Sequence, residues 1–379
     1  MKIASFTNCP IEPHLGSGKT VLQYTTGLRA LGHAVDAFSP SEYEFMPKKV
    51  KGRKFRQAYG ANQLLLKNDR WKNYDLIEFY GDEFWLPTRS LSRIPDHPLL
   101  VAHTNGLELL ASERQKPYRP GGVQGIARNI ISALTHSRFS QIAFKSADAF
   151  VSLCNLDTEY VIEKGLYPKD WTATIEPGLD SEYLSLPFRS NKEKRLVFTG
   201  SWIPRKGVET LVASVIPILK EHPEYALDIC GAASQISEVK ASFPADILSR
   251  VAVHPRLTEA QLAAILSNAE IYVFPTRYEG FGIATAEAMT ASCAVVTTRT
   301  GFGGSLKNGQ EAILCDFDSS EQFTAAIRKL ISDPVYRTTL AKKGWERARA
   351  LTWESNVAKL ERQYLNWLER HRKGERKWR

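Results

Sequence analysis

Short runs of β-branched and aromatic residues alternate with longer segments of helical periodicity along most of the chain. Such alternation is typical of βαβ units, in which helices connect the parallel strands of one sheet. The alternation lapses at residues 181–194, a polar stretch with one proline and no sustained period, and then resumes. The sequence therefore predicts an α/β protein with two successive parallel sheets and a linker at residues 181–194.

Each half of the chain contains five strand candidates. In the first half they are Lys2–Phe6, Ala34–Phe38, Asp75–Phe79, Leu99–His103 and Ala149–Leu153. In the second half they are Arg195–Thr199, Ala226–Cys230, Arg250–Val253, Ile271–Phe274 and Ala294–Thr297. A helix with an apolar face connects the first two candidates and ends at Gly32. A second helix is expected at Val208–Leu219, where Pro217 should kink or shorten it.

Length and composition are those of a globular protein. The chain has 379 residues, of which 43% are hydrophobic and 24% charged, so it can bury a core in each of two domains. Its five cysteines lie far apart without a C-x-x-C pair, which speaks against a zinc knuckle or a disulfide framework and favours a reducing compartment. No apolar stretch approaches the roughly 18 residues of a membrane span. These features predict a cytoplasmic protein.

Much of the net charge of +9 is concentrated in two clusters. Residues 48–56 contain six basic residues and no acid, and residues 370–379 contain six basic residues and one acid. Such clusters bind phosphate groups or an anionic membrane surface, although they are also common as solvated surfaces. We expect either peripheral contact with the inner face of a membrane through Lys48–Arg56 or a solvated surface there, and no nucleic-acid partner.

The segment Pro275–Glu287 follows the strand candidate Ile271–Phe274 and leads into a helix rich in small residues. Gly280 and Gly282 allow a ligand to approach the backbone closely, and the free N–H groups at the start of a helix bind anions. The sequence therefore predicts a diphosphate-binding loop in this segment.

Two glutamates, Glu279 and Glu287, lie eight residues apart in this segment, so they should face different parts of one ligand. A carboxylate near a phosphate is repelled by it unless the carboxylate accepts hydrogen bonds from hydroxyl groups, such as those of sugar and ribose rings. A nucleotide sugar would satisfy both glutamates. The alternative is that Glu279 only favours the helix N-terminus by its charge and that Glu287 is a surface residue.

The pattern E-G-F-G-x-x-x-x-E at residues 279–287 resembles the E-x7-E signature of glycosyltransferase family 4, whose members are retaining enzymes of the GT-B fold. Three weaker motifs extend the resemblance over most of the chain. The segment Phe198–Gly207 looks like the family's phosphate loop, Ala30–Val35 looks like the end of its first helix, and Trp353–Glu354 looks like the start of its C-terminal helix.

This resemblance implies a GT-B fold with two Rossmann-like domains facing a cleft. It implies an acceptor-binding domain at residues 1–180, a nucleotide-sugar donor domain at residues 181–352, and a helix at residues 353–379 that returns to the first domain and ends in the basic tail. It also implies a hexosyltransferase that moves a hexose-type sugar from a nucleotide-sugar donor to a glycan, lipid or small molecule. The anomeric configuration would be retained, and no essential metal or cofactor would be needed.

The resemblance also assigns roles by position. Lys206 would contact the donor diphosphate, Glu287 the ribose hydroxyls, and Glu279 the donor sugar as a catalytic residue. The backbone amides that would hold the phosphates are those of Gly280, Phe281, Gly282 and Ile283.

One departure from the family pattern affects the phosphate site. The family often has arginine directly after the glycine that matches Gly200, whereas this chain has Ser201. A leaving diphosphate needs positive charge nearby as the glycosidic bond breaks. Arg205, beside Lys206, is the candidate for compensating this loss, and a solvated surface arginine is the alternative.

Gly16 and Gly18 lie between the first strand and the first helix. The sequence Gly18-Lys19-Thr20 is similar to the end of a P-loop, but Pro13 occupies the place of the first P-loop glycine, which speaks against ATP binding. The resemblance implies that Gly16 and Gly18 approach the donor phosphates or the acceptor. A tight strand-to-helix turn is the alternative.

His103 ends the strand candidate Leu99–His103, where the family commonly has a histidine near the reacting sugar. The resemblance implies that it positions and polarises donor hydroxyl groups, whereas a lone histidine is usually structural. In retaining transfer by this family, the departing phosphate oxygen can accept the proton of the acceptor.

Three further segments have open interpretations. Asp316 and Asp318 form a D-x-D sequence, which transferases of another fold use to bind metal, but they precede a surface helix, so we expect no metal there. Residues 78–85 contain aromatic and acidic side chains that would line an acceptor pocket or belong to the core. The segment His254–Leu257 follows a strand at the place where the family receives the nucleotide base.

Two other functions remain open at this point. A sugar-nucleotide epimerase of the same fold would need no second substrate. A noncatalytic nucleotide-sugar-binding protein would use the same loops as a sensor, an alternative that the departure at Ser201 keeps open.

Overall fold

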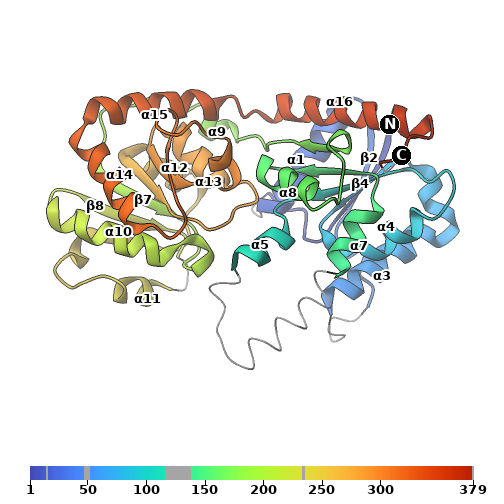
Figure 1. Ribbon diagram of the computed structural model, residues 1–379, viewed down its shortest axis with the longest axis horizontal. Coiled ribbons are helices and arrows are strands. Elements are labelled where there is room, and N and C mark those ends of the chain that lie inside the picture. The colour runs from blue at the N-terminus through green and yellow to red at the C-terminus, as the bar shows by residue number, and fades with distance from the viewer. Residues whose placement is uncertain (14–15, 47–51, 116–137, 233–234, 378–379) are drawn as a thin grey trace. The chain divides into compact units, whose positions relative to one another are not determined.

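The computed structural model describes residues 1–13, 16–46, 52–115, 138–232 and 235–377 (Figure 1). The chain folds into two compact units. Unit 1 comprises residues 1–177 together with residues 353–379, and unit 2 comprises residues 178–352. The stretch 181–194, expected as a linker, belongs to unit 2, where it contains the short helix α9 (Ser181–Leu184) and the start of a strand. Burial of Tyr183 fixes this segment to unit 2.

Unit 1 is built on a six-stranded sheet whose neighbouring strands are all parallel, in the order β2-β1-β3-β4-β5-β6. The strands are β1 (Lys2–Thr7), β2 (Ala34–Phe38), β3 (Leu76–Tyr80), β4 (Leu99–Thr104), β5 (Ala149–Ser152) and β6 (Thr172–Thr174). The helices are α1 (Gly16–Ala30), α2 (Pro40–Tyr43), α3 (Arg53–Leu66), α4 (Trp85–Leu91), α5 (Glu108–Gln115), α7 (Arg138–Ser146), α8 (Asn155–Glu163) and α16 (Trp353–Arg372).

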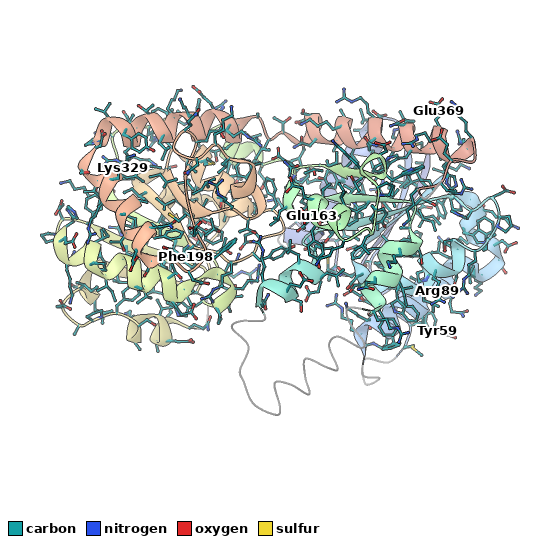
Figure 2. All side chains as sticks on the ribbon, viewed as in Figure 1. Tyr59, Arg89, Glu163, Phe198, Lys329 and Glu369 are labelled. Atoms are coloured by element: carbon teal, nitrogen blue, oxygen red, sulfur yellow. The ribbon has the colours of Figure 1, made fainter. Side chains whose placement is uncertain are left out.

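The last helix, α16, is part of unit 1. It packs against α1 so closely that a Cβ on Gly27 would lie 2.6 Å from Cγ2 of Val357. Its inner face buries Tyr364 and Trp367, whereas Glu369 is exposed on its outer face (Figure 2). The core of unit 1 thus includes side chains from both ends of the chain.

Unit 2 has a second six-stranded parallel sheet, in the order β12-β11-β10-β7-β8-β9. The strands are β7 (Glu193–Thr199), β8 (Ala226–Cys230), β9 (Val251–His254), β10 (Ala269–Phe274), β11 (Ala294–Thr298) and β12 (Ile313–Cys315). Besides α9, the helices are α10 (Val208–Glu221), α11 (Ile236–Ala241), α12 (Glu259–Asn268), α13 (Ile283–Thr290), α14 (Ser320–Ser332) and α15 (Pro334–Arg349). Two six-stranded parallel sheets confirm the predicted fold class.

Three details differ from the sequence-based expectations. The helix α10 is not shortened by Pro217 but continues to Glu221. The short strands β6 and β12 were not predicted, because three residues are too few to show a strand period.

The sheet order in unit 2 determines where a ligand site can form. The strands β7 and β10 are neighbours at the centre of the sheet and run parallel, so the loops that follow them meet at the same edge. In open parallel sheets, ligands bind beyond the carboxyl ends of the strands. None of the described helices is both long and apolar enough to pass through a lipid bilayer.

Candidate functional site

The loops after β7 and β10 are joined by direct backbone contacts. The backbone N–H of Arg277 donates to the carbonyl of Arg205 at 2.9 Å. Gly207 has a φ of +69°, and a Cβ at this position would lie only 1.9 Å from the carbonyl oxygen of Pro275. A glycine is therefore required here both by the left-handed backbone and by the close approach of the second loop.

Lys206 and Glu279 form an ion pair across these two loops. The Nζ of Lys206 lies 2.7 Å from Oε1 of Glu279, and the hydroxyl of Thr276 donates to the same oxygen at 2.8 Å. The side chains of Lys206 and Glu279 are 14% and 11% exposed, so both are largely withdrawn from water. The structure thus brings together two residues that the sequence placed on separate motifs.

Arg205 also points toward this pair. Its guanidinium donates to the carbonyl of Tyr278 at 2.9 Å and lies 3.8 Å from Oε1 of Glu279. Ser201 is exposed in the loop after β7. Arg205 therefore supplies positive charge beside Glu279, although the family's usual arginine position holds a serine.

Arg277 was not singled out from the sequence. Its side chain is nearly buried, and its guanidinium donates to the carbonyl of Pro204 at 2.6 Å and to Oδ1 of Asp318 at 2.7 Å. Glu209 lies 3.3 Å from the same guanidinium. Arg277 thus fastens the loop that carries Lys206 to the loop that carries Glu279.

The glycine-rich segment leads directly into α13. Gly282 is the N-cap of this helix with a φ of +80°, and Ile283 is its first residue. Phe281 is buried, and the N–H of Phe302 donates to its carbonyl at 2.5 Å. Gly280 lies between Glu279 and Phe281, so the four predicted phosphate-binding residues are placed together at the start of a helix.

Glu287 is half-buried on α13 and lies close to Tyr183 of α9. Burial, with the negative charge of Glu287 as the next contribution, raises the pKa of Tyr183. The Tyr183 hydroxyl is buried and has no hydrogen-bond partner among the described residues. Tyr183 is a second neighbour of the site that the sequence did not reveal.

In unit 1, His103 is enclosed in the core. It is 1% exposed, and its Nε2 is hydrogen-bonded to the hydroxyl of Tyr364 and lies 3.4 Å from Oε2 of Glu78. Ser5 and Tyr364 both donate to Glu78. In this conformation the His103 ring contacts α16. This agrees with the alternative that a lone histidine is structural.

Burial shifts both ionisable groups of this network toward their neutral forms. Desolvation raises the pKa of Glu78 to about 7, although the hydroxyls of Ser5 and Tyr364 act in the opposite direction. Desolvation lowers the pKa of His103 to about 3. The imidazole is therefore neutral at physiological pH.

Gly16 and Gly18 occupy the first turn of α1. Gly16 is exposed, and a Cβ there would meet no atom within 4 Å. Gly18 is buried, and a Cβ there would lie 2.3 Å from the carbonyl of Pro10. Close packing inside unit 1 thus accounts for Gly18, while Gly16 is available at the surface. His14 and Leu15 of the same loop lie outside the described residues.

A cavity of about 360 Å³ lies at the carboxyl ends of β1, β3 and β4 in unit 1. Ser17 at the start of α1 and Tyr80, Asp82 and Glu83 from the segment 78–85 contribute to its lining. Other residues of that segment belong to the core, since Phe79 and Phe84 are buried and stack on each other. Part of the segment 78–85 thus belongs to the core and part lines this cavity, while its role toward an acceptor stays a prediction.

The acids of this cavity have partners within unit 1. Nζ of Lys54 lies 2.6 Å from Oδ2 of Asp82, and the amide of Asn8 donates to Oε2 of Glu83 at 2.7 Å. Burial and the neighbouring charge of Asp82 raise the pKa of Glu83. Asn105 also lines the cavity, and its Oδ1 has no hydrogen-bond partner among the described residues.

The remaining candidates are accounted for as follows. Oδ2 of Asp316 accepts from the amide of Gln322 at 2.8 Å, and Asp318 pairs with Arg277, so both carboxylates of the D-x-D sequence contact protein groups. His254 ends β9, and its Nε2 is 2.8 Å from Oδ1 of Asp228.

The basic cluster 48–56 lies partly outside the described residues, which begin again at residue 52. Arg53 donates to the carbonyl of Asn8, Lys54 pairs with Asp82, and Arg56 pairs with Glu44 at 2.6 Å. On the same helix, Phe55 is 51% and Tyr59 is 41% exposed (Figure 2).

Comparison with known proteins shows what most of the second unit is similar to. Residues 193–333 match the family model described as Glycosyl transferases group 1. The uncharacterized glycosyltransferase YqgM of Bacillus subtilis is 26% identical over 265 residues, which cover 69% of this chain and 69% of that protein. The uncharacterized glycosyltransferase MJ1178 of Methanocaldococcus jannaschii is 25% identical over 169 residues, 44% of this chain and 47% of that protein. The chain thus spans about half of one relative and about two thirds of the other.

Solved structures resemble nearly the whole chain. Sucrose-phosphate synthase from Thermosynechococcus elongatus has a TM-score of 0.74 at 18% identity and covers 97% of this chain and 100% of its own. Anabaena Alr3699/HepE in complex with UDP has a TM-score of 0.69 at 15% identity, with coverage of 97% and 100%. Likeness at such low identity shows the fold. Residues 193–333 thus match the model of group 1 glycosyltransferases, and the chain has the GT-B fold of the solved glycosyltransferase structures.

Proposed function

We propose that the protein transfers a hexose-type sugar from a nucleotide-sugar donor to an acceptor, with retention of the anomeric configuration and without an essential metal ion. The observation that carries this proposal is the Lys206–Glu279 pair, held at the start of α13 between the loops that follow β7 and β10. A cation, a carboxylate and free helix amides in one place suit a ligand that has both phosphates and hydroxyls.

The donor diphosphate would bind to Lys206, Arg205 and the backbone amides of residues 280–283. These groups are positive or carry N–H donors, so they can stabilise the charge that develops on the leaving diphosphate. In many transferases a divalent metal supplies that charge, and here the two basic side chains and the helix N-terminus would do so. Anabaena Alr3699/HepE was solved with bound UDP and Arabidopsis thaliana Starch Synthase IV with bound ADP, and this chain shares their fold, which supports a nucleoside diphosphate as the leaving group.

The two glutamates would hold the sugars of the donor. Glu279, fixed by Lys206 and Thr276, would accept hydrogen bonds from hydroxyls of the transferred hexose. Glu287, eight residues further on, would accept from the ribose hydroxyls, with the Tyr183 hydroxyl beside it as an additional donor. The base would lie near His254, at the end of β9.

Retention requires the acceptor hydroxyl to attack from the face that the diphosphate leaves. The departing phosphate oxygen would take the acceptor proton, so no separate general base is needed. The absence of a general base agrees with the environment of His103. Its imidazole is buried, neutral and hydrogen-bonded to Tyr364, so it is not placed to accept that proton. Its proposed role in positioning donor hydroxyls requires the ring to become accessible.

The acceptor would bind in the cavity of about 360 Å³ in unit 1. The acids Asp82, Glu83 and Glu108 outnumber the base Lys54 in its lining, and Asn105 offers a buried acceptor oxygen. Such a lining favours an acceptor rich in hydroxyl groups over an anionic one.

Peripheral contact with an anionic membrane through Lys48–Arg56 is also part of the proposal. The exposed rings of Phe55 and Tyr59 support it, because aromatic side chains next to basic ones favour the lipid interface. Co-sedimentation with anionic vesicles should fall with added salt and with neutralisation of Lys48, Lys49 and Lys51. Salt-independent binding would contradict this part.

The test of the function uses a panel of nucleotide sugars, first by thermal shift to find the donor and then by turnover. Incubation of that donor with and without glycan, lipid and small-molecule acceptors should release nucleotide only when an acceptor is present, and the product should keep the donor's anomeric configuration. Glu279→Ala should abolish turnover, while Glu321→Ala, an exposed glutamate on α14, should not.

Three results would overturn the proposal. Formation of an isomeric nucleotide sugar without acceptor would show an epimerase. Donor binding without turnover for any acceptor, together with capture of a defined protein partner, would show a sensor. Unchanged turnover in Glu279→Ala would exclude this site.

A further inference from the structure

A second group of ionisable side chains lies in unit 1, away from the residues assigned to transfer. Among the described residues, His97, Asp148 and His371 bring one ligand atom each to within 4.8 Å of one another, and all three residues are buried. Oδ2 of Asp148 lies 3.7 Å from Nδ1 of His97 and 3.8 Å from Nδ1 of His371. Two imidazoles and a carboxylate are a common ligand set for Zn²⁺.

Two neighbouring strands and the helix α16 position the three residues. His97 and Asp148 precede the neighbouring strands β4 and β5, and His371 lies in the last turn of α16. The backbone N–H of Leu100 donates to Oδ2 of Asp148 at 2.9 Å, and the N–H of Asp148 donates to the carbonyl of Leu100 at 2.8 Å. Asp148 is therefore fixed at the amino ends of the strands, opposite the edge that holds the unit 1 cavity.

The hydrogen bond made by Nε2 of His371 leaves the other ring nitrogen, Nδ1, as the atom that could bind a metal. Its Nε2 donates to the carbonyl of His97 at 2.8 Å, so in the neutral ring the lone pair is on Nδ1, which faces Asp148. Metal-bound histidines typically donate their other N–H to a carbonyl or carboxylate in this way. His97 needs a larger adjustment, because its Nδ1–H donates to the carbonyl of Pro98 at 2.8 Å. Binding a metal through Nδ1 gives up this hydrogen bond and moves the ring proton to Nε2.

Two basic groups neighbour the site: Arg376 beside His371, and the buried Lys377, whose charge acts on Asp148. Their repulsion of a cation must be offset by the bonds that the three ligands form. A tetrahedral zinc with bonds of about 2.0 to 2.1 Å places its ligand atoms roughly 3.3 Å apart. The two histidine–aspartate separations of 3.7 and 3.8 Å therefore need to close by about half an ångström, and the separation of the two imidazole nitrogens, which is within 4.8 Å, by up to about 1.5 Å. His97 and His371 line a cavity of about 500 Å³, from which water can supply a fourth ligand. Nη1 of Arg376 lies 3.4 Å from Nδ1 of His371 and also donates to the carbonyls of His371 and Glu375, so the guanidinium has to move away from Nδ1 when a metal binds there.

We propose that His97, Asp148 and His371 form a structural Zn²⁺ site that fastens the end of α16 to the sheet of unit 1. Two ligands come from the beginning of β4 and β5, and the third comes from the last helix of the chain. The metal would hold together parts of unit 1 that are separated by the whole of unit 2 in the sequence. This inference does not depend on the proposed transfer reaction.

The test uses the full chain without a histidine tag, freed of metal with a chelator and then dialysed. Co²⁺ titration should give the visible d–d absorption of a tetrahedral site at one equivalent, and Zn²⁺ should displace it. Zn²⁺ at about 100 times its dissociation constant should raise the melting temperature by about 5 °C. His371→Ala and Asp148→Asn should each abolish the cobalt spectrum, whereas His222→Ala, a partly exposed histidine of unit 2, should leave it unchanged.

Two outcomes would overturn the site. The first is that the wild-type chain takes up no Co²⁺ or Zn²⁺ at a stoichiometric level. The second is that His97→Gln and His371→Ala both bind one equivalent with the wild-type spectrum. Circular dichroism of each metal-free variant identifies those that remain folded, and zinc X-ray absorption of the wild type reports imidazole ligation even if a variant fails to fold.

Discussion

The Nζ of Lys206 lies 2.7 Å from Oε1 of Glu279, although the two residues follow different strands of the unit 2 sheet. Thr276 binds the same carboxylate oxygen from the side, so the direction of the glutamate is set before any ligand arrives. A donor phosphate would share the ammonium with Glu279, and the free carboxylate oxygen would remain for a sugar hydroxyl. Preorganised charges of this kind favour a transition state because they need no reorientation.

Removal of the ammonium tests this relationship. Lys206→Ala should lower kcat/KM by about 100-fold, because the leaving diphosphate loses its nearest positive charge. Lys220→Ala, an exposed lysine of α10, is the matched control and should have no effect. Steady-state kinetics with the donor found by thermal shift measure both. Equal rates for the two variants would remove Lys206 from the phosphate site.

Arg277 should act as a positioning residue. Arg277→Met removes a buried guanidinium whose carbonyl and carboxylate partners are themselves partly exposed, so it should destabilise unit 2 by about 1 to 2 kcal/mol and raise the KM for the donor more than it lowers kcat. Arg328→Met breaks an exposed, solvent-screened pair with Glu221 and should leave the stability of unit 2 nearly unchanged. Denaturant unfolding gives the free energies. A stability loss without a change in donor KM would indicate a purely structural role.

Gly207 provides a test of the loop contact itself. Gly207→Ala forces a left-handed φ on alanine and places its Cβ against the carbonyl of Pro275, so we expect a destabilisation of about 2 kcal/mol or more, together with loss of donor binding. Gly16→Ala, where a Cβ meets nothing within 4 Å, is the control and should leave thermal stability unchanged or slightly raised. An unaltered melting temperature for Gly207→Ala would contradict the geometry of the two loops.

The sequence predicted most strands, and it singled out the loop of the candidate site, because both leave local signals. Runs of β-branched residues mark β7 and β10, and the spacing of Glu279 and Glu287 marks the loop between β10 and α13. Arg277 has no such signal, since an arginine in a loop looks the same whether it is solvated or buried against three partners. Only the fold shows that it connects the two loops.

Contacts between distant segments were also beyond sequence reasoning. His103 could be assigned a place at the end of a strand, but its partner Tyr364 lies on the last helix and no pattern joins the two. The same holds for His97, Asp148 and His371, whose spacing matches no short metal-binding motif. Such pairs depend on how α16 packs, which is a property of tertiary structure.

Glu78 should make stability depend on pH. Because its folded pKa of about 7 lies above the ordinary value of 4.5, its contribution to stability is complete below pH 4.5 and is lost as the pH rises to about 7. Glu78→Gln does not ionise. Between pH 5 and pH 8 the wild type should therefore lose about 2 to 3 kcal/mol of its free energy of unfolding relative to Glu78→Gln. Urea unfolding of both proteins at several pH values measures the difference, and a constant difference would refute the shifted pKa.

Glu83 tests the acceptor cavity. Glu83→Gln replaces an acceptor-only carboxylate by an amide, so the KM for the acceptor should rise by about 10-fold while donor binding stays the same. Glu163→Gln on α8, an exposed glutamate of the same unit, serves as the control (Figure 2). Inhibition by acceptor analogues that compete with the acceptor distinguishes an effect on acceptor binding from an effect on donor binding. An effect on donor binding alone would place the acceptor elsewhere.

Because α16 belongs to unit 1, the order of synthesis differs from the order in which the two cores can be completed. The strands of unit 1 leave the ribosome first, yet Glu78 and His103 must wait for Tyr364, which is made only after the whole of unit 2. Unit 2 is continuous in the chain and can finish folding while the nascent protein is still attached. A chain that stops before residue 353 would therefore release a complete unit 2 beside a first unit whose buried carboxyl and imidazole groups have lost their tyrosine partner.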